Sequence, residues 1–198
     1  MIITFANHKG GVGKTSLAVA VAEWAVETGL PVKLYDIDPQ QDFNYAMQQW
    51  TKNPGVSSKL PEKLPDDKLV IIDTPPGMGA ETERAIRIAD KVVVPIDTKP
   101  AAIKGIAGVV GNCKNKPIVV LNRFRKGYSF NENMRTYIQK LTSSEAVLVE
   151  LPECNMFAFN VAEGSDWLYR MSKKTAKPFL DFIHLLFIEN LERRGGKK

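Results

Sequence analysis

Short apolar runs alternate along the chain with stretches in which apolar residues recur at helical spacing. The runs are apolar at consecutive positions, which predicts strands buried on both faces, at residues 2–6, 32–37, 69–72, 91–96, 118–121 and 146–149. Helices are predicted over residues 16–28, 41–52, 80–89, 101–110, 131–141 and 178–191. This alternation indicates a doubly wound α/β fold, with a mostly parallel sheet flanked by helices.

Composition narrows the class of protein. The chain has 198 residues, 44% hydrophobic and 25% charged, which is typical of a soluble globular protein. We expect a single domain over residues 1–198, without an N-terminal helix-turn-helix domain, and a surface loop over residues 53–67. Cys113 and Cys154 are isolated from each other in sequence, which favours a reducing compartment such as the cytoplasm over a zinc or iron–sulfur site.

The excess positive charge lies near the C-terminus. The net charge is +5, from 27 basic and 22 acidic residues. Residues 170–198 hold eight of the basic and three of the acidic ones, so the rest of the chain is balanced. Such a region is a candidate surface for a polyanion, either nucleic acid or an acidic membrane, although a solvated helix face with a basic tail has the same composition.

A glycine-rich segment, HKGGVGKT at residues 8–15, lies between the first predicted strand and the first predicted helix. A phosphate-binding P-loop requires this context. The glycines let backbone N–H groups turn toward phosphate oxygens, and the helix N-terminus adds a partial positive charge. Lys14 is expected to reach the β- and γ-phosphates and the Thr15 hydroxyl to ligate Mg²⁺. The alternative, a solvated glycine-rich turn without a ligand, does not account for the spacing of these residues.

Three carboxylates follow predicted strands. Asp36 and Asp38 come at the end of the second strand, and Asp73 directly follows the apolar run at residues 69–72. Carboxylates at the carboxyl ends of parallel strands, beside a P-loop, suit metal binding and the positioning of water. An aspartate after a strand is often only a helix cap, but the P-loop upstream favours the metal role.

The glycine-rich motif departs from the general P-loop pattern, because His8 replaces the first glycine and a second lysine, Lys9, follows it. In this form it resembles the deviant Walker A box of the ParA/MinD family of ATPases, in particular the short ParA-type plasmid partition ATPases. The segments YDIDPQ at 35–40 and DTPPG at 73–77 resemble that family too. The resemblance implies a P-loop NTPase that binds ATP and Mg²⁺ as a nucleotide-sandwich homodimer, in which Lys9 acts on the partner subunit's phosphates.

The same resemblance implies roles for individual residues. Lys9, Lys14 and Asp38 would be catalytic, with Asp38 orienting the attacking water, while Thr15, Asp36 and Asp73 would surround Mg²⁺. Adenine contacts are implied where later strands end, although asparagine is also a common turn residue. The implied nucleotide-binding set is Lys9, Gly10, Gly11, Val12, Gly13, Lys14, Thr15, Ser16, Asn122, Arg123, Pro152 and Glu153.

The resemblance implies DNA partition as the function. The ATP dimer would bind DNA non-specifically on the nucleoid, and a centromere-binding, ParB-like partner protein would stimulate the hydrolysis that releases it. Non-specific DNA binding needs clustered lysine and arginine side chains on phosphates. The candidates are Lys173, Lys174, Lys177, Arg123, Arg125 and Lys126, each of which could instead make a surface salt bridge.

Two other functions remain open. A MinD-like membrane-positioning ATPase would use the apolar stretch at residues 179–188 with the basic residues that follow it. Apolar residues cover most of that helix's circumference, so we favour a packed terminal helix and expect no membrane partner. A metabolic enzyme on the same fold, such as an amide-forming synthetase, would need a second substrate site that the sequence does not reveal.

Overall fold

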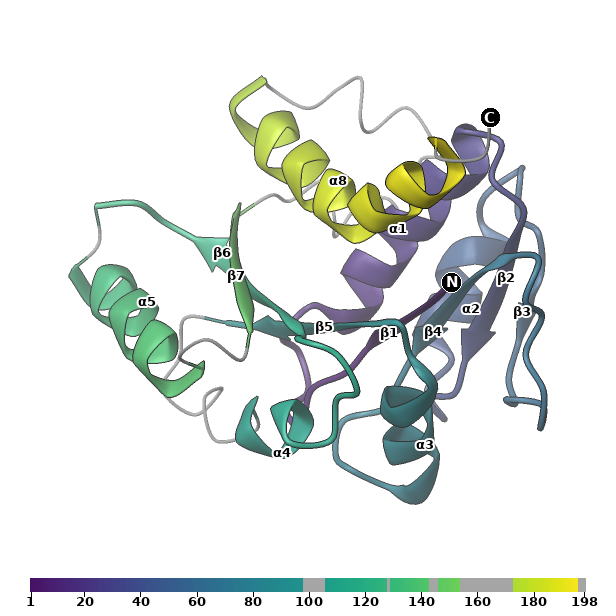
Figure 1. The fold of residues 1–198 in the computed structure, drawn as a ribbon, viewed down its shortest axis with the longest axis horizontal. Coiled ribbons are helices and arrows are strands. Elements are labelled where there is room, and N and C mark those ends of the chain that lie inside the picture. The colour runs from purple at the N-terminus through teal and green to yellow at the C-terminus, as the bar shows by residue number, and fades with distance from the viewer. Residues whose placement is uncertain (98–105, 128, 143–145, 154–172, 196–198) are drawn as a thin grey trace.

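The computed structural model describes residues 1–97, 106–127, 129–142, 146–153 and 173–195. Among these residues, seven strands form one all-parallel sheet in the order β3-β2-β4-β1-β5-β6-β7 (Figure 1). The strands are β1 (Ile2–Phe5), β2 (Val32–Asp36), β3 (Val56–Ser57), β4 (Leu69–Asp73), β5 (Lys91–Ile96), β6 (Ile118–Phe124) and β7 (Val147–Pro152). The predicted doubly wound parallel fold is confirmed.

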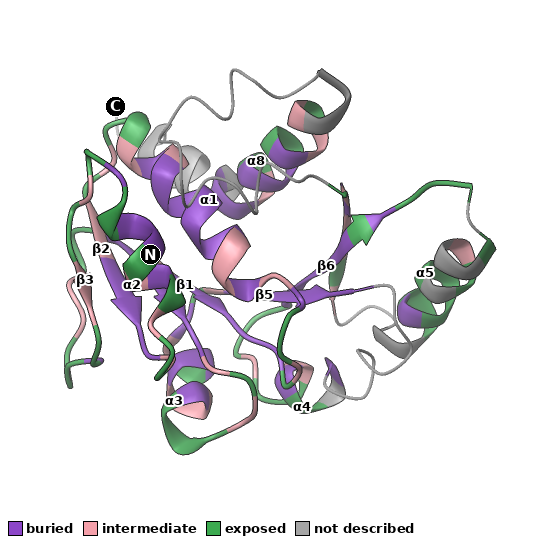
Figure 2. Cartoon of the chain, turned by 180° about the vertical axis from the view of Figure 1, so that it is seen from behind, coloured by how far each residue is buried: buried purple, intermediate pink, exposed green. Residues whose placement is uncertain are grey.

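Helices cover both faces of the sheet. The described helices are α1 (Lys14–Glu27), α2 (Asp42–Gln48), α3 (Ala80–Ile88), α4 (Ile106–Val110), α5 (Ser129–Thr142) and α8 (Lys173–Gly195). Buried side chains of α1, α2 and α8 share one core with the sheet, and those of α3, α4 and α5 pack against the other face. Figure 2 shows the buried strands running between these two layers.

Neighbouring positions of one strand enter different cores, which explains the continuous apolar runs. In β5, Val93 joins the core under α1, while Val92 and Val94 join the core under α3 and α4. Both faces of a parallel sheet are covered, so successive side chains must both be apolar. All three of these valines are buried.

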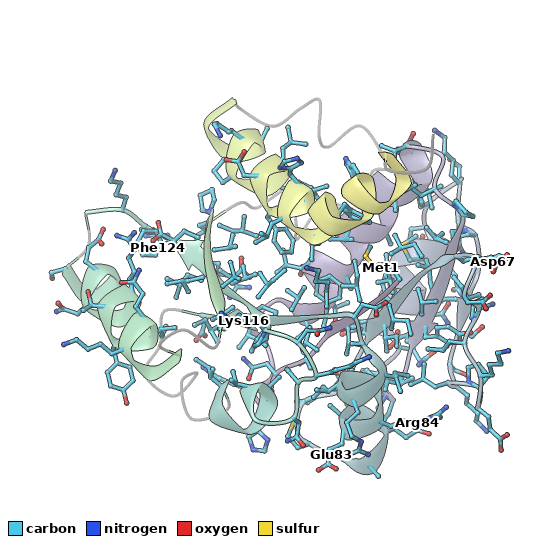
Figure 3. All side chains as sticks on the ribbon, in the orientation of Figure 1. Met1, Asp67, Glu83, Arg84, Lys116 and Phe124 are labelled. Carbon is cyan, nitrogen blue, oxygen red and sulfur yellow. The ribbon has the colours of Figure 1, made fainter. Side chains whose placement is uncertain are left out.

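The predicted surface loop at residues 53–67 contains a short strand that the sequence did not reveal. β3 has two residues and pairs in parallel with Leu34 and Tyr35 at the edge of the sheet. Edge pairing of this kind depends on backbone groups, and its residues carry no apolar run that marks a strand. Arg84 of α3, labelled in Figure 3, donates to the carbonyl oxygens of Leu60, Pro61 and Glu62 and thereby ties the loop to helix α3.

Element ends differ from prediction at three places that matter for function. α1 begins at Lys14 rather than at residue 16, and β6 continues to Phe124 rather than ending at residue 121. α8 begins at Lys173, with Pro178 inside the helix, whereas the sequence pattern predicts that the helix begins at Pro178. Proline lacks the N–H that would bond to the carbonyl oxygen four residues earlier, so Pro178 leaves α8 with one backbone hydrogen bond fewer near its start. Of the helix predicted over residues 101–110, the structure describes residues 106–110.

The apolar side of α8 is part of the core. Phe179, Phe182, Ile183, Leu186 and Phe187 are buried in the same cluster as α1. Phe187 packs against Trp24 of α1 with ring centroids 5.0 Å apart. The packed terminal helix that the sequence favoured is confirmed for these residues. Within the described part of the chain, the search for a helix long and apolar enough to cross a membrane found none.

Candidate nucleotide-binding site

The predicted phosphate loop lies between β1 and α1, at the carboxyl edge of the central strand. Gly11 and Gly13 take left-handed backbone conformations, with φ of 74° and 102°, which side chains disfavour. Gly13 is the N-cap of α1, so Lys14 and Thr15 occupy the first helical turn. Free N–H groups of a first turn favour an anion. The loop therefore has the local geometry that phosphate binding requires.

Gly13 is also needed because of a residue from the distant strand β6. A Cβ atom at position 13 would collide with Nδ2 of Asn122. That Nδ2 donates a 2.9 Å hydrogen bond to the carbonyl oxygen of Val12, and Asn122 is buried. Asn122 thus holds the loop in place, a role that the sequence did not reveal. Its contact with adenine stays a prediction.

Lys14 lies inside the loop and is buried. Its ammonium donates to the carbonyl oxygen of Lys9 at 3.4 Å. Burial lowers the pKa of Lys14, while the negative charges of Asp73 and Asp38 act in the opposite direction. A phosphate group in the loop would supply the counter-charge that this buried ammonium needs.

Thr15 and Asp73 meet as predicted for a magnesium site. The Thr15 hydroxyl donates a 2.6 Å hydrogen bond to Oδ2 of Asp73, which ends β4 and is fully buried. Burial raises the pKa of Asp73 to about 7, although the Thr15 hydrogen bond lowers it. A hydroxyl and one carboxylate fit Mg²⁺, which takes oxygen ligands and completes its shell with water and phosphate oxygens. These two residues can therefore hold the ion.

Asp36, which was predicted to support the Mg²⁺ shell, accepts backbone hydrogen bonds on both of its carboxylate oxygens. Its Oδ1 accepts from the N–H of Asp38 at 3.1 Å and its Oδ2 from the N–H of Asn44 at 2.9 Å. Both oxygens therefore shape the turn after β2 and the start of α2. Asp36 pairs in register with Asp73 on the neighbouring strand, and burial raises its pKa. Its metal role remains a prediction.

Asp38 lies in this turn and is partly buried. Its Oδ1 accepts from the N–H of Gln40 at 3.0 Å. Gln41, in a left-handed conformation, donates from Nε2 to the carbonyl oxygens of Asp36 and Asp38, at 2.8 Å each. The charge of Asp38 acts on the pKa values of Lys14 and Asp73, so the turn holds this carboxylate within electrostatic reach of the phosphate loop.

Lys9 is held within its own subunit. Its ammonium forms an ion pair with Asp97, which directly follows β5, with Nζ 3.2 Å from Oδ2 and 3.3 Å from Oδ1. Its N–H donates to Oδ1 of Asn7 at 2.9 Å. Neither Asn7 nor Asp97 was among the predicted site residues. Both follow strands of the predicted sheet, so the rule that ligands bind at carboxyl strand ends could have found them.

The other predicted nucleotide contacts lie where β6 and β7 end. The pairing of the two strands is irregular between Leu121 and Phe124, and Arg123 there is exposed with a φ of 60°. Phe124 pairs with Pro152, and Glu153 accepts hydrogen bonds from the guanidinium of Arg125. Glu153 is thus engaged by a side chain that was itself predicted to contact DNA.

The predicted DNA-binding residues lie in two places, on α8 and near the end of β6. Lys177 on α8 forms an exposed ion pair with Asp181 at 2.6 Å, and Arg125 pairs with Glu153. Arg123 and Lys126 are exposed near the end of β6. Lys173 and Lys174 belong to the first turn of α8, but their side chains lie outside the described part of the structure.

Comparison with known sequences identifies a matching family and several relatives. A family model described as the CobQ/CobB/MinD/ParA nucleotide binding domain matches residues 3–167. The chain is similar to the chromosome-partitioning ATPase Soj of Thermus thermophilus, at 29% identity with 54% of this chain and 59% of Soj aligned. It is 32% identical to maintenance of carboxysome distribution protein A of Gloeobacter kilaueensis over half of each chain. The chain spans about half the length of the curated relatives it matches.

Solved structures share the fold. A Borrelia burgdorferi B31 protein assigned to plasmid partition, bound to AMPPNP, has a TM-score of 0.68 at 15% identity, covering 96% of this chain and 98% of that one. The cell division protein MinD of Aquifex aeolicus has a TM-score of 0.68 at 16% identity, covering 94% and 96%. The pNOB8 ParA bound to nonspecific DNA has a TM-score of 0.54 at 15% identity, covering 75% and 78%. At these identities the likeness concerns the fold alone, whereas the family match covers most of the chain. The chain therefore belongs to the CobQ/CobB/MinD/ParA nucleotide-binding domain family.

Proposed function

We propose that this chain is a partition ATPase, which binds ATP and Mg²⁺, dimerises around the nucleotide and binds DNA non-specifically. One observation carries the proposal: Lys9 and Lys14 lie in a single phosphate loop, beside the hydrogen-bonded pair of Thr15 and Asp73. Two lysines in this loop are what the family resemblance implies for a nucleotide-sandwich dimer.

Each group at the site has a part in nucleotide binding. The N–H groups of the loop and the first turn of α1 bind phosphate oxygens, and Lys14 neutralises their charge. Thr15 and Asp73 hold Mg²⁺, which when bound neutralises the charge that develops on the phosphates. Burial of Lys14 and Asp73 strengthens these electrostatic interactions because the surroundings have a low dielectric constant.

Hydrolysis requires a water molecule oriented for attack on the terminal phosphate. Asp38 is the carboxylate proposed for this role, because it acts electrostatically on Lys14 and its turn is tied down by Asp36 and Gln41. Lys9 of each subunit would reach the phosphates bound by the partner. A dimer that forms with ATP and separates after hydrolysis is a two-state switch biased by the terminal phosphate.

The proposed partners are DNA and a ParB-like, centromere-binding protein. The proposed location is the cytoplasm, on the nucleoid. The similarity to Soj and to a ParA bound to nonspecific DNA supports the DNA partner. Exposed Arg123 and Lys126, together with the lysines at the start of α8, are the candidate phosphate contacts.

Membrane positioning of the MinD type is the second candidate, supported by the fold similarity to MinD. The burial of Phe179, Phe182 and Phe187 disfavours it, because these side chains are already used in the core. An interfacial helix needs its apolar side available to lipid.

Co-sedimentation distinguishes the two candidates. The full chain is incubated with random-sequence DNA, or with liposomes containing anionic lipid, in the presence of ATP, ADP or no nucleotide. DNA partition predicts ATP-dependent binding to DNA that falls steeply as salt is raised. ATP-dependent binding to liposomes would favour membrane positioning. Binding to neither would overturn both proposals and leave a nucleotide-binding enzyme.

A further inference from the structure

The ion pair between Lys9 and Asp97 is a built contact within one subunit. The Asp97 side chain is only 10% exposed and the Lys9 side chain 30%, so water screens the pair less than an ordinary surface pair. Both carboxylate oxygens lie within 3.3 Å of Nζ. The geometry holds the ammonium beside the end of β5.

The backbone of Lys9 is tied to the same strand. Asn7 accepts from the N–H of Lys9 at 2.9 Å and donates from Nδ2 to the carbonyl oxygen of Pro95 in β5 at 2.6 Å. Asn7 is fully buried. Lys9 is therefore anchored to β5 through its backbone and through its side chain, which fixes where the ammonium lies.

This arrangement conflicts with the role in trans that the proposed function gives to Lys9. In that role the ammonium would leave Asp97 for the phosphates bound by a partner subunit. When Lys9 leaves, the nearly buried carboxylate of Asp97 loses this ion pair, and the loss opposes formation of the dimer. We propose that Asp97 is an intramolecular latch that retains Lys9 and so sets the nucleotide and protein concentrations at which the dimer forms.

The inference rests on the proposed function, because it assumes that Lys9 acts in trans. The exposure of this pair is intermediate between those of surface and buried ion pairs. Loss of the pair should therefore change the monomer–dimer equilibrium constant by about tenfold per subunit. Both subunits release a latch when the dimer forms. Removing the latch should thus tighten the dimer dissociation constant by up to about 100-fold.

Sedimentation velocity over a range of protein concentrations, with AMPPNP and Mg²⁺, tests the latch. The variant Asp97→Asn removes the charge at nearly constant volume, and Asp97→Ser serves as a second variant if the first one folds poorly. Asp181→Asn is the matched control, since it breaks the lysine–aspartate pair on α8. Lys9→Ala reports on the role in trans, and thermal unfolding without nucleotide checks that each variant is folded.

The expected result is that Asp97→Asn dimerises at lower protein concentration than the natural chain, that Asp181→Asn is unchanged and that Lys9→Ala does not dimerise. If Lys9→Ala loses the dimer while the Asp97 variants dimerise no better than the natural chain, the latch is wrong and the proposed function stands. If Lys9→Ala keeps the nucleotide-dependent dimer, the role in trans is wrong, and the latch falls with it.

Discussion

The hydroxyl of Thr15 lies 2.6 Å from Oδ2 of Asp73 and donates a hydrogen bond to it. The two residues are 58 positions apart in sequence and come from the first turn of α1 and the end of β4. Oδ1 of the same carboxylate accepts from the N–H of Thr74 at 3.1 Å. The aspartate is thus fully buried, with a hydrogen-bond donor on each of its two oxygens.

The first prediction concerns the pH dependence of stability. Burial raises the pKa of Asp73 from its ordinary value of 3.8 to about 7, so between these values the folded protein holds a proton that the unfolded chain lacks. The contribution of this group to the free energy of unfolding therefore falls as the pH rises from about 4 to about 7. Above about pH 7 this contribution no longer changes with pH. Asp73→Asn should remove that part of the slope.

Denaturant unfolding of the nucleotide- and metal-free protein, at several pH values, measures this slope. Asp67→Asn is the control, because Asp67 is exposed (Figure 3). Equal slopes for the natural chain and Asp73→Asn would show that Asp73 is ionised in the folded protein across this range.

Lys14→Ala should weaken the binding of ATP by about 100-fold or more, since a buried ammonium makes charge-assisted hydrogen bonds to phosphate. Isothermal titration calorimetry with ATP and Mg²⁺ measures the loss. Lys68→Ala, at an exposed lysine outside the loop, should bind ATP normally. Retained affinity in Lys14→Ala would refute the assignment of the P-loop.

Asp38→Ala should trap the ATP dimer. Loss of the carboxylate that orients water should lower phosphate release by about 100-fold or more, in the range found for general acid–base groups. ATP binding should persist, because Lys14, Thr15 and Asp73 are intact. Phosphate release and sedimentation are measured in parallel, with exposed Asp66→Ala as the control. Normal turnover would transfer the role to another group, with Asp36 the next to test.

Asn122→Ala should loosen the phosphate loop. It removes the hydrogen bond to the Val12 carbonyl, and the lost buried contact should lower the free energy of unfolding by about 1–3 kcal/mol. A double-mutant cycle with Gly13→Ala tests the contact directly. Gly13→Ala should cost less in the Asn122→Ala background, because the colliding amide is gone. Additive costs in calorimetry or denaturant unfolding would contradict the contact.

The variant Lys173→Glu with Lys174→Glu should weaken DNA binding to a similar extent for all sequences and reduce its salt dependence, because phosphate contacts carry no base information. Fluorescence anisotropy with two unrelated duplexes at several salt concentrations measures both effects. Arg123→Glu with Lys126→Glu is the comparison, as these side chains are exposed near β6. Unaltered affinity in the first variant and a loss in the second would place the DNA contacts near β6.

Much of the fold could be predicted because strands and helices depend on local patterns. Each strand predicted from an apolar run is present, and the P-loop was identified from its own residues and from the strand and helix around it. The two-residue β3 was missed, since it exists only through pairing with β2 at the sheet edge. The end of β6 was misplaced, because Asn122 and Arg123 interrupt the apolar run while the strand continues through an irregular pairing.

The sequence by itself determined the parallel α/β architecture, the phosphate loop and the presence of Asp36, Asp38 and Asp73 at the carboxyl ends of strands. The spacing of residues and the alternation of strands and helices along the chain are sufficient to predict these features. Tertiary structure alone decided which groups those residues contact. Lys9 meets Asp97 across 88 positions, and Asn122 meets Val12 across 110. No local pattern encodes such pairs, since they form only when the sheet brings the ends of β1, β5 and β6 together.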